Sequence, residues 1–150
     1  MPFQVVHPQQ WPENLDYGNK RVVVVGSGAT AVTLVPAMTD KAAHVTMLQR
    51  SPTYVVSIPE KDPIANSMRR FLPEKLVYRV TRAKNVSLTL GFFNLAKKRP
   101  KPIRRLLLAQ VRAQVGKDFD MKHFTPSYNP WDERLCAVPD GDLFKVLRKG

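Results

Sequence analysis

The stretch from Lys20 to Pro52 constrains the fold of this chain more than any other part of the sequence. It opens with the consecutive valines Val22 to Val25, a run typical of a parallel strand that is covered on both faces. A glycine turn follows at once, then a helical segment, then a second strand from His44 to Leu48. This order predicts an α/β fold in which a crossover helix joins two parallel strands.

The glycine turn reads Gly26-Ser27-Gly28-Ala29-Thr30-Ala31, a G-x-G-x-x-A pattern. In such a pattern the first glycine permits a tight turn, and the second lets backbone approach a pyrophosphate. The small third residue lets the helix pack close to the strand, and the helix N-terminus faces the phosphates. The pattern favours dinucleotide binding, which makes all six residues candidates for cofactor contact. An ordinary strand–helix turn is the alternative, because glycine turns are common.

The end of the second strand indicates which dinucleotide would bind. It carries Gln49, Arg50 and Ser51 where an NAD-binding unit usually has an acidic residue for the ribose hydroxyls. An arginine and a serine would instead bind a 2′-phosphate, so the sequence predicts NADPH. A solvated arginine at a strand end is an equally ordinary interpretation of Arg50.

Charge is distributed unevenly along the chain, whose net charge is +12. Residues 66–117 hold 14 of the 24 Lys and Arg residues and only one acidic residue, Glu74. Three interpretations remain open for this segment. In decreasing order of preference they are a solvated helical insertion, a membrane-surface contact beside Phe92-Phe93, and a nucleic-acid contact. Nucleic acid ranks last because no recognised motif accompanies the charge, and aromatic residues do not alternate with the basic ones.

Apolar spacing predicts two helices within this basic segment. The first begins at Pro73, whose fixed φ suits a first turn, and its apolar stripe is Leu76, Val77, Val80 and Ala83. A loop over Lys97 to Pro102 should interrupt the pattern. A second amphipathic helix follows, with its stripe at Ile103, Leu106, Leu107, Gln110 and Val111. Further on, Pro139 to Gly141 should form a turn, and Leu143 to Lys149 a short last helix.

Several function classes find no support in the sequence. His44 and His123 are isolated from Cys and from other His residues at ligand spacing, so no metal site is indicated. The single cysteine, Cys136, is best interpreted as a buried structural thiol. No G-x-S-x-G or H-E-x-x-H motif occurs, and no apolar run is long enough to span a bilayer. We therefore expect a cytoplasmic protein, with membrane association as an open alternative.

Three motifs in one order resemble the flavin-containing and Baeyer–Villiger monooxygenases. The family fingerprint, F-x-G-x-x-x-H-x-x-x-W-P, stands just before an NADPH-binding glycine turn, and His7, Trp11 and Pro12 match it here. Its front does not match, because Phe3 stands where the fingerprint has glycine. The second strand with Arg50-Ser51 and the segments FTPSYNPWD and DGDLF continue the likeness across almost the whole chain.

The resemblance implies an FAD- and NADPH-dependent monooxygenase that acts on small ketones, sulfides or thioamides. It assigns Arg134 a catalytic role, in which the arginine lies over the flavin and stabilises negative charge there. Relatives often carry a lysine before that arginine, whereas this chain has Glu133. Local pairing of Arg134 with Asp132 or Glu133 is the alternative. The resemblance gives no role to nucleic acid.

The predicted organisation has four parts: a linker with the fingerprint (1–19), a partial Rossmann-like βαβ unit for NADPH (20–63), a basic helical insertion (64–117) and a loop-rich segment with a short helix (118–150). Only one glycine motif is present, and we expect the chain to stop before a third parallel strand forms. We therefore expect the NADPH-binding portion of a larger enzyme, inactive alone. The alternative is a non-catalytic module that binds NADP(H) or an anionic membrane surface.

Overall fold

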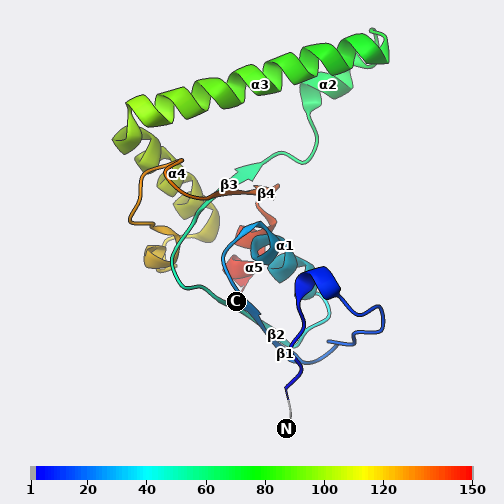
Figure 1. The fold of residues 1–150 in the computed structure, drawn as a ribbon, viewed down its shortest axis with the longest axis vertical. Coiled ribbons are helices and arrows are strands. Elements are labelled where there is room, and N and C mark those ends of the chain that lie inside the picture. The colour runs from blue at the N-terminus through cyan, green and yellow to red at the C-terminus, as the bar shows by residue number, and fades with distance from the viewer. Residues whose placement is uncertain (1–2, 150) are drawn as a thin grey trace. The chain divides into compact units, whose positions relative to one another are not determined.

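The computed structural model describes residues 3–149 and shows a mixed α/β chain (Figure 1). The chain divides into two compact units, Met1–Ser51 and Pro52–Gly150, which we call unit 1 and unit 2. Each unit contains its own two-stranded parallel sheet. No helix within residues 3–149 is both long enough and apolar enough to cross a membrane.

Unit 1 contains the strand–turn–helix–strand order that the sequence predicts. A 3-10 helix, η1 (Pro8–Gln10), precedes β1 (Arg21–Val25), α1 (Ala29–Met38) and β2 (His44–Leu48). The two strands are parallel, with Arg21 opposite His44 and Val25 opposite Leu48. Helix α1 packs against both strands and buries Ala31, Val32, Val35 and Met38. The prediction of two parallel strands joined by a helix is therefore confirmed.

The expectation that β1 is covered on both faces is wrong in this structure. Val23 is 59% exposed and Val25 is 78% exposed, and Leu48 on the neighbouring strand is 56% exposed. Side chains alternate between the two faces of a strand, and α1 lies on one face of the sheet only. The valine run thus favours a strand correctly, but one side of that strand remains in contact with solvent.

Unit 2 has a second parallel sheet that the sequence analysis does not anticipate. Strand β3 (Tyr54–Ile58) pairs with β4 (Leu135–Pro139), with Tyr54 opposite Leu135. The elements between the two strands are α2 (Pro63–Met68), α3 (Glu74–Lys98), α4 (Pro100–Val115) and the 3-10 helix η2 (Met121–Phe124), and α5 (Asp142–Lys149) follows β4. Within residues 3–149 the β1–β2 sheet gains no third strand, because β3 and β4 form a separate sheet.

The core of unit 2 forms where α4 meets β3, α3 and α5. The Tyr54 side chain is 1% exposed, and its hydroxyl donates a 2.8 Å hydrogen bond to the carbonyl oxygen of Tyr128. Burial raises the pKa of the Tyr54 phenol above its ordinary value of 10.0. On the α5 side, the rings of Phe124 and Phe144 lie 5.5 Å apart, and Leu143 is completely buried.

Two long helices form in the segment where the sequence predicts them, but their packing matches the prediction only in part. Helix α3 begins directly after Pro73, and α4 buries Ile103, Leu107 and Val111. The predicted stripe of α3 is correct at Val77, which is buried, but wrong at Leu76, which is 45% exposed, and at Val80, which is 42% exposed. Figure 1 shows why: α3 runs as one long helix with α2 against one end and α4 at the other, and no other helix among the described residues of unit 2 packs along the stretch between them.

The loop predicted over residues 97–102 is also wrong. Helices α3 and α4 are separated only by Arg99, whose φ of −133° and ψ of 65° are not helical. Pro100 has no N–H group and so cannot continue α3, but its fixed φ is suited to the first turn of α4. The proline therefore produces a sharp break between two helices where the sequence analysis expects an open loop.

Candidate functional site

The glycine turn adopts the geometry that its residue types predict. Gly26 has a φ of +133°, a conformation that side-chain-bearing residues rarely adopt, and its N–H donates a 2.7 Å hydrogen bond to the carbonyl oxygen of Leu48. A Cβ atom built on Gly26 lies 4.0 Å from the Cβ of Ala31, so the small residue at the third position allows close packing. A Cβ atom built on Gly28 meets nothing within 4 Å, so the space in front of this glycine is open.

The N-terminus of α1 lies directly behind this open space. Gly28 is the N-cap residue, no side chain caps the helix, and its first turn has no acidic residue. The first backbone hydrogen bond of the helix runs from the N–H of Val32 to the carbonyl oxygen of Gly28, at 3.1 Å. Ala29 and Thr30 are exposed. An uncapped helix N-terminus with this surrounding is suited to an anion, because its N–H groups and the helix dipole are both positive.

The segment after β2 lies beside the glycine turn. The buried hydroxyl of Ser27 donates a 3.2 Å hydrogen bond to the carbonyl oxygen of Ser51. Arg50, which lies between the end of β2 and Ser51, is exposed. The structure thus brings the two predicted groups, Gly26 to Ala31 and Gln49 to Ser51, to one edge of the unit 1 sheet. Sequence reasoning missed the Ser27–Ser51 contact, because nothing local relates two serines that lie 24 positions apart.

The fingerprint residues belong to the segment that precedes β1. The Nδ1 atom of His7 accepts a 3.3 Å hydrogen bond from the N–H of Gln9 and so caps η1. Trp11 is 39% exposed, and its ring meets the edge of Tyr17 with centroids 6.1 Å apart. Pro12 accepts a 3.1 Å backbone bond from Leu15. These contacts give the fingerprint a local structural role within unit 1.

Arg134 belongs to unit 2, on the segment that leads into β4. Its side chain is exposed, and its carbonyl oxygen accepts a 3.0 Å hydrogen bond from the hydroxyl of Tyr128. The nearby carboxylate of Asp132 pairs with Lys97 at 2.7 Å, and this contact lowers the pKa of Asp132. Asp132, one of the two local partners considered for Arg134, is therefore engaged by a lysine of α3.

Cys136 is buried in β4, as predicted, and burial raises the pKa of its thiol. A thiol in such surroundings is less reactive, because the thiolate is the nucleophilic form. Among the residues that the structure describes, no group of three or more His, Cys, Asp or Glu side chains is arranged to hold a metal ion.

No protein-family model matches the chain. Individual relatives do match it over almost its whole length. The sequence is 60% identical over 148 residues to the probable FAD-binding monooxygenase AlmA of Acinetobacter baylyi, covering 98% of this chain and 30% of the relative. It is 53% identical over 148 residues to the FAD-containing monooxygenase EthA of Mycobacterium tuberculosis, covering 97% of this chain and again 30% of the relative. The chain thus spans 30% of the length of these curated relatives.

A solved structure shares the fold. The crystal structure of OTEMO in complex with FAD and NADP matches 95% of this chain and 33% of its own chain, with a TM-score of 0.58 at 17% sequence identity. At that identity the likeness concerns the fold alone. The sequence relatives, at 53% and 60% identity, confirm the resemblance that the three motifs indicate. Over the stretch that it spans, the chain is therefore similar in sequence to one part of the FAD-containing monooxygenases.

Proposed function

We propose that unit 1 is a partial Rossmann-like unit that binds NADP(H) within an FAD-dependent monooxygenase. The observation that carries this proposal is the meeting of two segments at one sheet edge. The open space in front of Gly28 lies at an uncapped helix N-terminus, and the Ser27–Ser51 hydrogen bond holds the segment with Arg50 beside it. A pyrophosphate and a 2′-phosphate need such a pair of anion-binding groups next to each other.

Each candidate residue has a distinct part in this binding. Gly28 leaves room for the pyrophosphate, and the N–H groups of Ala29, Thr30 and Ala31 face it from the first turn of α1. Gly26 adopts the positive φ that the turn requires, and the Ser27 hydroxyl donates a hydrogen bond to the backbone carbonyl oxygen of Ser51. The guanidinium of Arg50, with the polar groups of Gln49 and Ser51, would hold the 2′-phosphate. When bound, NADPH supplies a hydride, and the flavin of the relatives carries the oxygen chemistry.

Calorimetric titration of the purified chain tests this assignment. We expect NADPH to bind at least tenfold more tightly than NADH, because one bidentate contact between arginine and phosphate is worth on the order of 1.5–3 kcal/mol. Arg50→Ala should remove the difference between the two cofactors. Arg21→Ala is the matched control: it removes the same charge from an exposed arginine at the opposite end of the strands. Equal affinities for NADPH and NADH in the unaltered chain would refute the assignment.

The proposal for the whole enzyme is a Baeyer–Villiger-type monooxygenase that acts on small ketones, sulfides or thioamides, with Arg134 stabilising negative charge at the flavin. The identity of 53–60% to FAD-containing monooxygenases supports it over a non-catalytic module. The FAD-binding glycine motif is not among these 150 residues, so the chain alone should bind NADPH without oxygen uptake. NADPH-dependent oxygen uptake by the pure chain would contradict this.

The location of the enzyme belongs to the same proposal. We place it in the cytoplasm, with a peripheral membrane contact through residues 66–117. The high positive charge of this segment supports such a contact, since basic side chains near a membrane surface are attracted to anionic lipids.

A further inference from the structure

The connection between α2 and α3 exposes large apolar side chains to solvent. We define the α2–α3 corner as residues 62–84. Phe71, between the two helices, is 85% exposed, and Leu72 beside it is 38% exposed. Other exposed apolar side chains of the corner are Ile64, Leu76, Tyr78 and Val80. A cluster of this kind on a surface marks a contact site, because isolated exposed apolar residues are ordinary but grouped ones are not.

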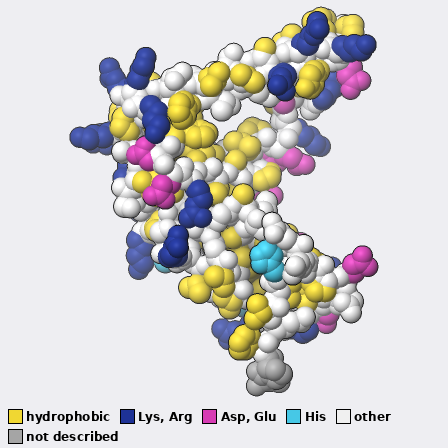
Figure 2. Space-filling model, viewed as in Figure 1, with side chains coloured by type: hydrophobic (Ala, Val, Ile, Leu, Met, Phe, Trp, Pro, Cys, Tyr) yellow, Lys and Arg dark blue, Asp and Glu magenta, His cyan; other side chains and the backbone are white. Residues whose placement is uncertain are grey.

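The charged side chains of the same corner are mostly basic. They are Arg69, Arg70, Lys75, Arg79 and Arg82, with Glu74 as the acidic residue outside the Asp62–Lys84 ion pair. Figure 2 shows Lys and Arg side chains mixed with hydrophobic ones over the end of α3 that lies against α2, at the upper right. Apolar side chains surrounded by basic ones are typical of surfaces that lie in a lipid interface.

A hollow of about 230 Å³ opens between the two helices of the corner. Arg69 from the end of α2 and Arg82 from α3 both line it, together with Glu74 and the polar side chains of Thr81 and Asn85. The hydroxyl oxygen of Thr81 is buried and has no hydrogen-bond partner. Two arginine side chains that line one hollow are suited to the oxygens of a phosphate group.

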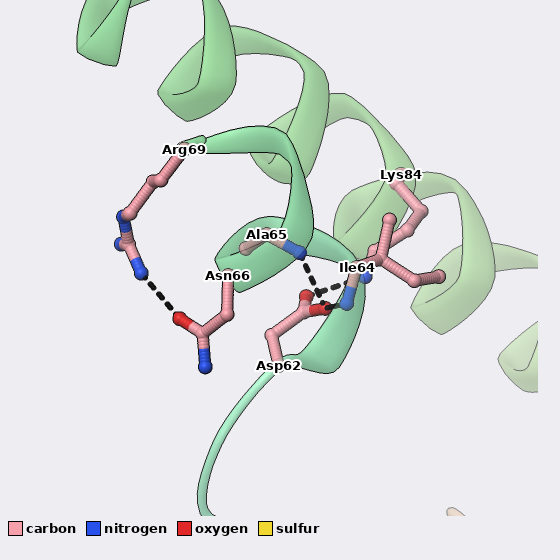
Figure 3. A network of polar contacts seen from close by, with 6 residues as sticks. All are labelled: Asp62, Ile64, Ala65, Asn66, Arg69 and Lys84. Atoms are coloured by element: carbon pink, nitrogen blue, oxygen red, sulfur yellow. Dashed lines mark hydrogen bonds and ion pairs between the residues drawn. The ribbon is translucent and has the colours of Figure 1, made fainter. Parts of the chain in front are cut away.

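Polar contacts fix this corner before any partner arrives (Figure 3). The carboxylate of Asp62 accepts hydrogen bonds from the N–H groups of Ile64 at 3.0 Å and Ala65 at 3.1 Å, and it pairs with Lys84 of α3. The guanidinium of Arg69 donates a 2.7 Å bond to the side-chain oxygen of Asn66. Helix α2 is therefore tied to α3, and the basic and apolar side chains are presented on a formed surface.

We propose that the α2–α3 corner docks on the surface of an anionic lipid bilayer. Phe71 and Leu72 enter the boundary between headgroups and acyl chains, and the basic side chains remain with the headgroup phosphates. A dry protein interface fits less well, because such interfaces are depleted in charge and would bury several cations without partners. This inference specifies the partner of the membrane contact proposed above and does not depend on the cofactor site.

Vesicle flotation of the purified chain, without NADPH, tests the docking. We expect the chain to float with vesicles that contain phosphatidylglycerol and not with vesicles of phosphatidylcholine alone. Phe71→Ser should weaken binding about tenfold, since a large apolar side chain no longer leaves water. The matched control is Leu106→Ser, because Leu106 is 60% exposed and follows Arg104-Arg105 just as Phe71 follows Arg69-Arg70. The control should bind like the unaltered chain, and circular dichroism checks that each variant is folded.

A pair of charge variants separates the corner from the general positive charge of the chain. Arg69→Ala with Arg82→Ala should weaken binding more than Lys101→Ala with Arg105→Ala, which removes the same charge from exposed positions of α4. Equal losses in both pairs, or full binding by Phe71→Ser, would overturn the proposal in favour of diffuse attraction. Binding to neither kind of vesicle would also overturn the proposal. A dimer in solution that Phe71→Ser dissociates would do so as well, since the corner would then be covered by a second copy of the chain.

Discussion

The two glycines of the turn should respond in opposite ways to the same substitution. Gly26 has a φ of +133°, so Gly26→Ala forces an alanine into a strained backbone conformation at a cost of about 1–3 kcal/mol. Space is not the obstacle, because the added Cβ meets Ala31 at an ordinary 4.0 Å. Gly28 has a φ of −82° and a ψ of −178°, which any residue adopts, and its Cβ meets nothing within 4 Å. Gly28→Ala should therefore change stability by less than about 0.5 kcal/mol.

Cofactor affinity should show the reverse pattern at Gly28. The methyl group of Gly28→Ala occupies the space through which a pyrophosphate would approach, so NADPH binding should weaken at least tenfold in a folded protein. Hydrogen exchange read by mass spectrometry measures the stability part. Peptides from β1 and β2 should exchange about 5- to 150-fold faster in Gly26→Ala and at the normal rate in Gly28→Ala. If Gly28→Ala binds NADPH as tightly as the unaltered chain, the open space is not the pyrophosphate site.

Three further predictions concern unit 2. Phe144→Ala removes a side chain that is 1% exposed and should lower the free energy of unfolding in urea by about 3–5 kcal/mol, whereas Phe71→Ala, at an 85% exposed position, should change it by less than about 0.5 kcal/mol. Burial raises the pKa of the Tyr54 phenol in the folded state, so the unfolded chain loses this proton at a lower pH than the folded one. Stability should therefore fall as pH rises above 10, and Tyr54→Phe should reduce this loss in thermal melts. The hydrogen bond from Lys84 lowers the pKa of Asp62, so the contact between α2 and α3 is present above the ordinary carboxylate pKa of 3.8 and should be lost at lower pH. Amide exchange in α2 should then become faster at low pH, whereas exchange in α5 should not.

Local pattern was sufficient to predict unit 1. The valine run, the glycine turn and the run from His44 to Leu48 each specify their element through residues close together in the sequence, and the structure has both strands where the pattern indicates. The covering of β1 could not be predicted in the same way. Whether Val23 and Val25 become buried depends on what packs against the second face of the sheet, and the valines themselves contain no information about that.

Non-local pairing explains what was missed in unit 2. Strands β3 and β4 pair although Tyr54 and Leu135 lie far apart in the sequence, and neither strand is accompanied by a turn motif like the one after β1. The exposure of α3 likewise depends on its neighbours, since Val77 is buried only where α2 lies against the helix. At the candidate site, the glycine turn and Arg50 were found from residue type. The Ser27–Ser51 bond that joins them required the fold.

The most direct test of NADP(H) binding by unit 1 is an NMR titration of the ¹⁵N-labelled chain with NADP⁺. Backbone amide shifts should move first and most strongly at Gly26 to Ala31 and at Gln49 to Ser51, and the residues of α3 and α4 should hardly respond. Shifts confined to the basic residues 66–117, with the glycine turn unchanged, would show that the nucleotide is attracted by positive charge alone and would contradict the account.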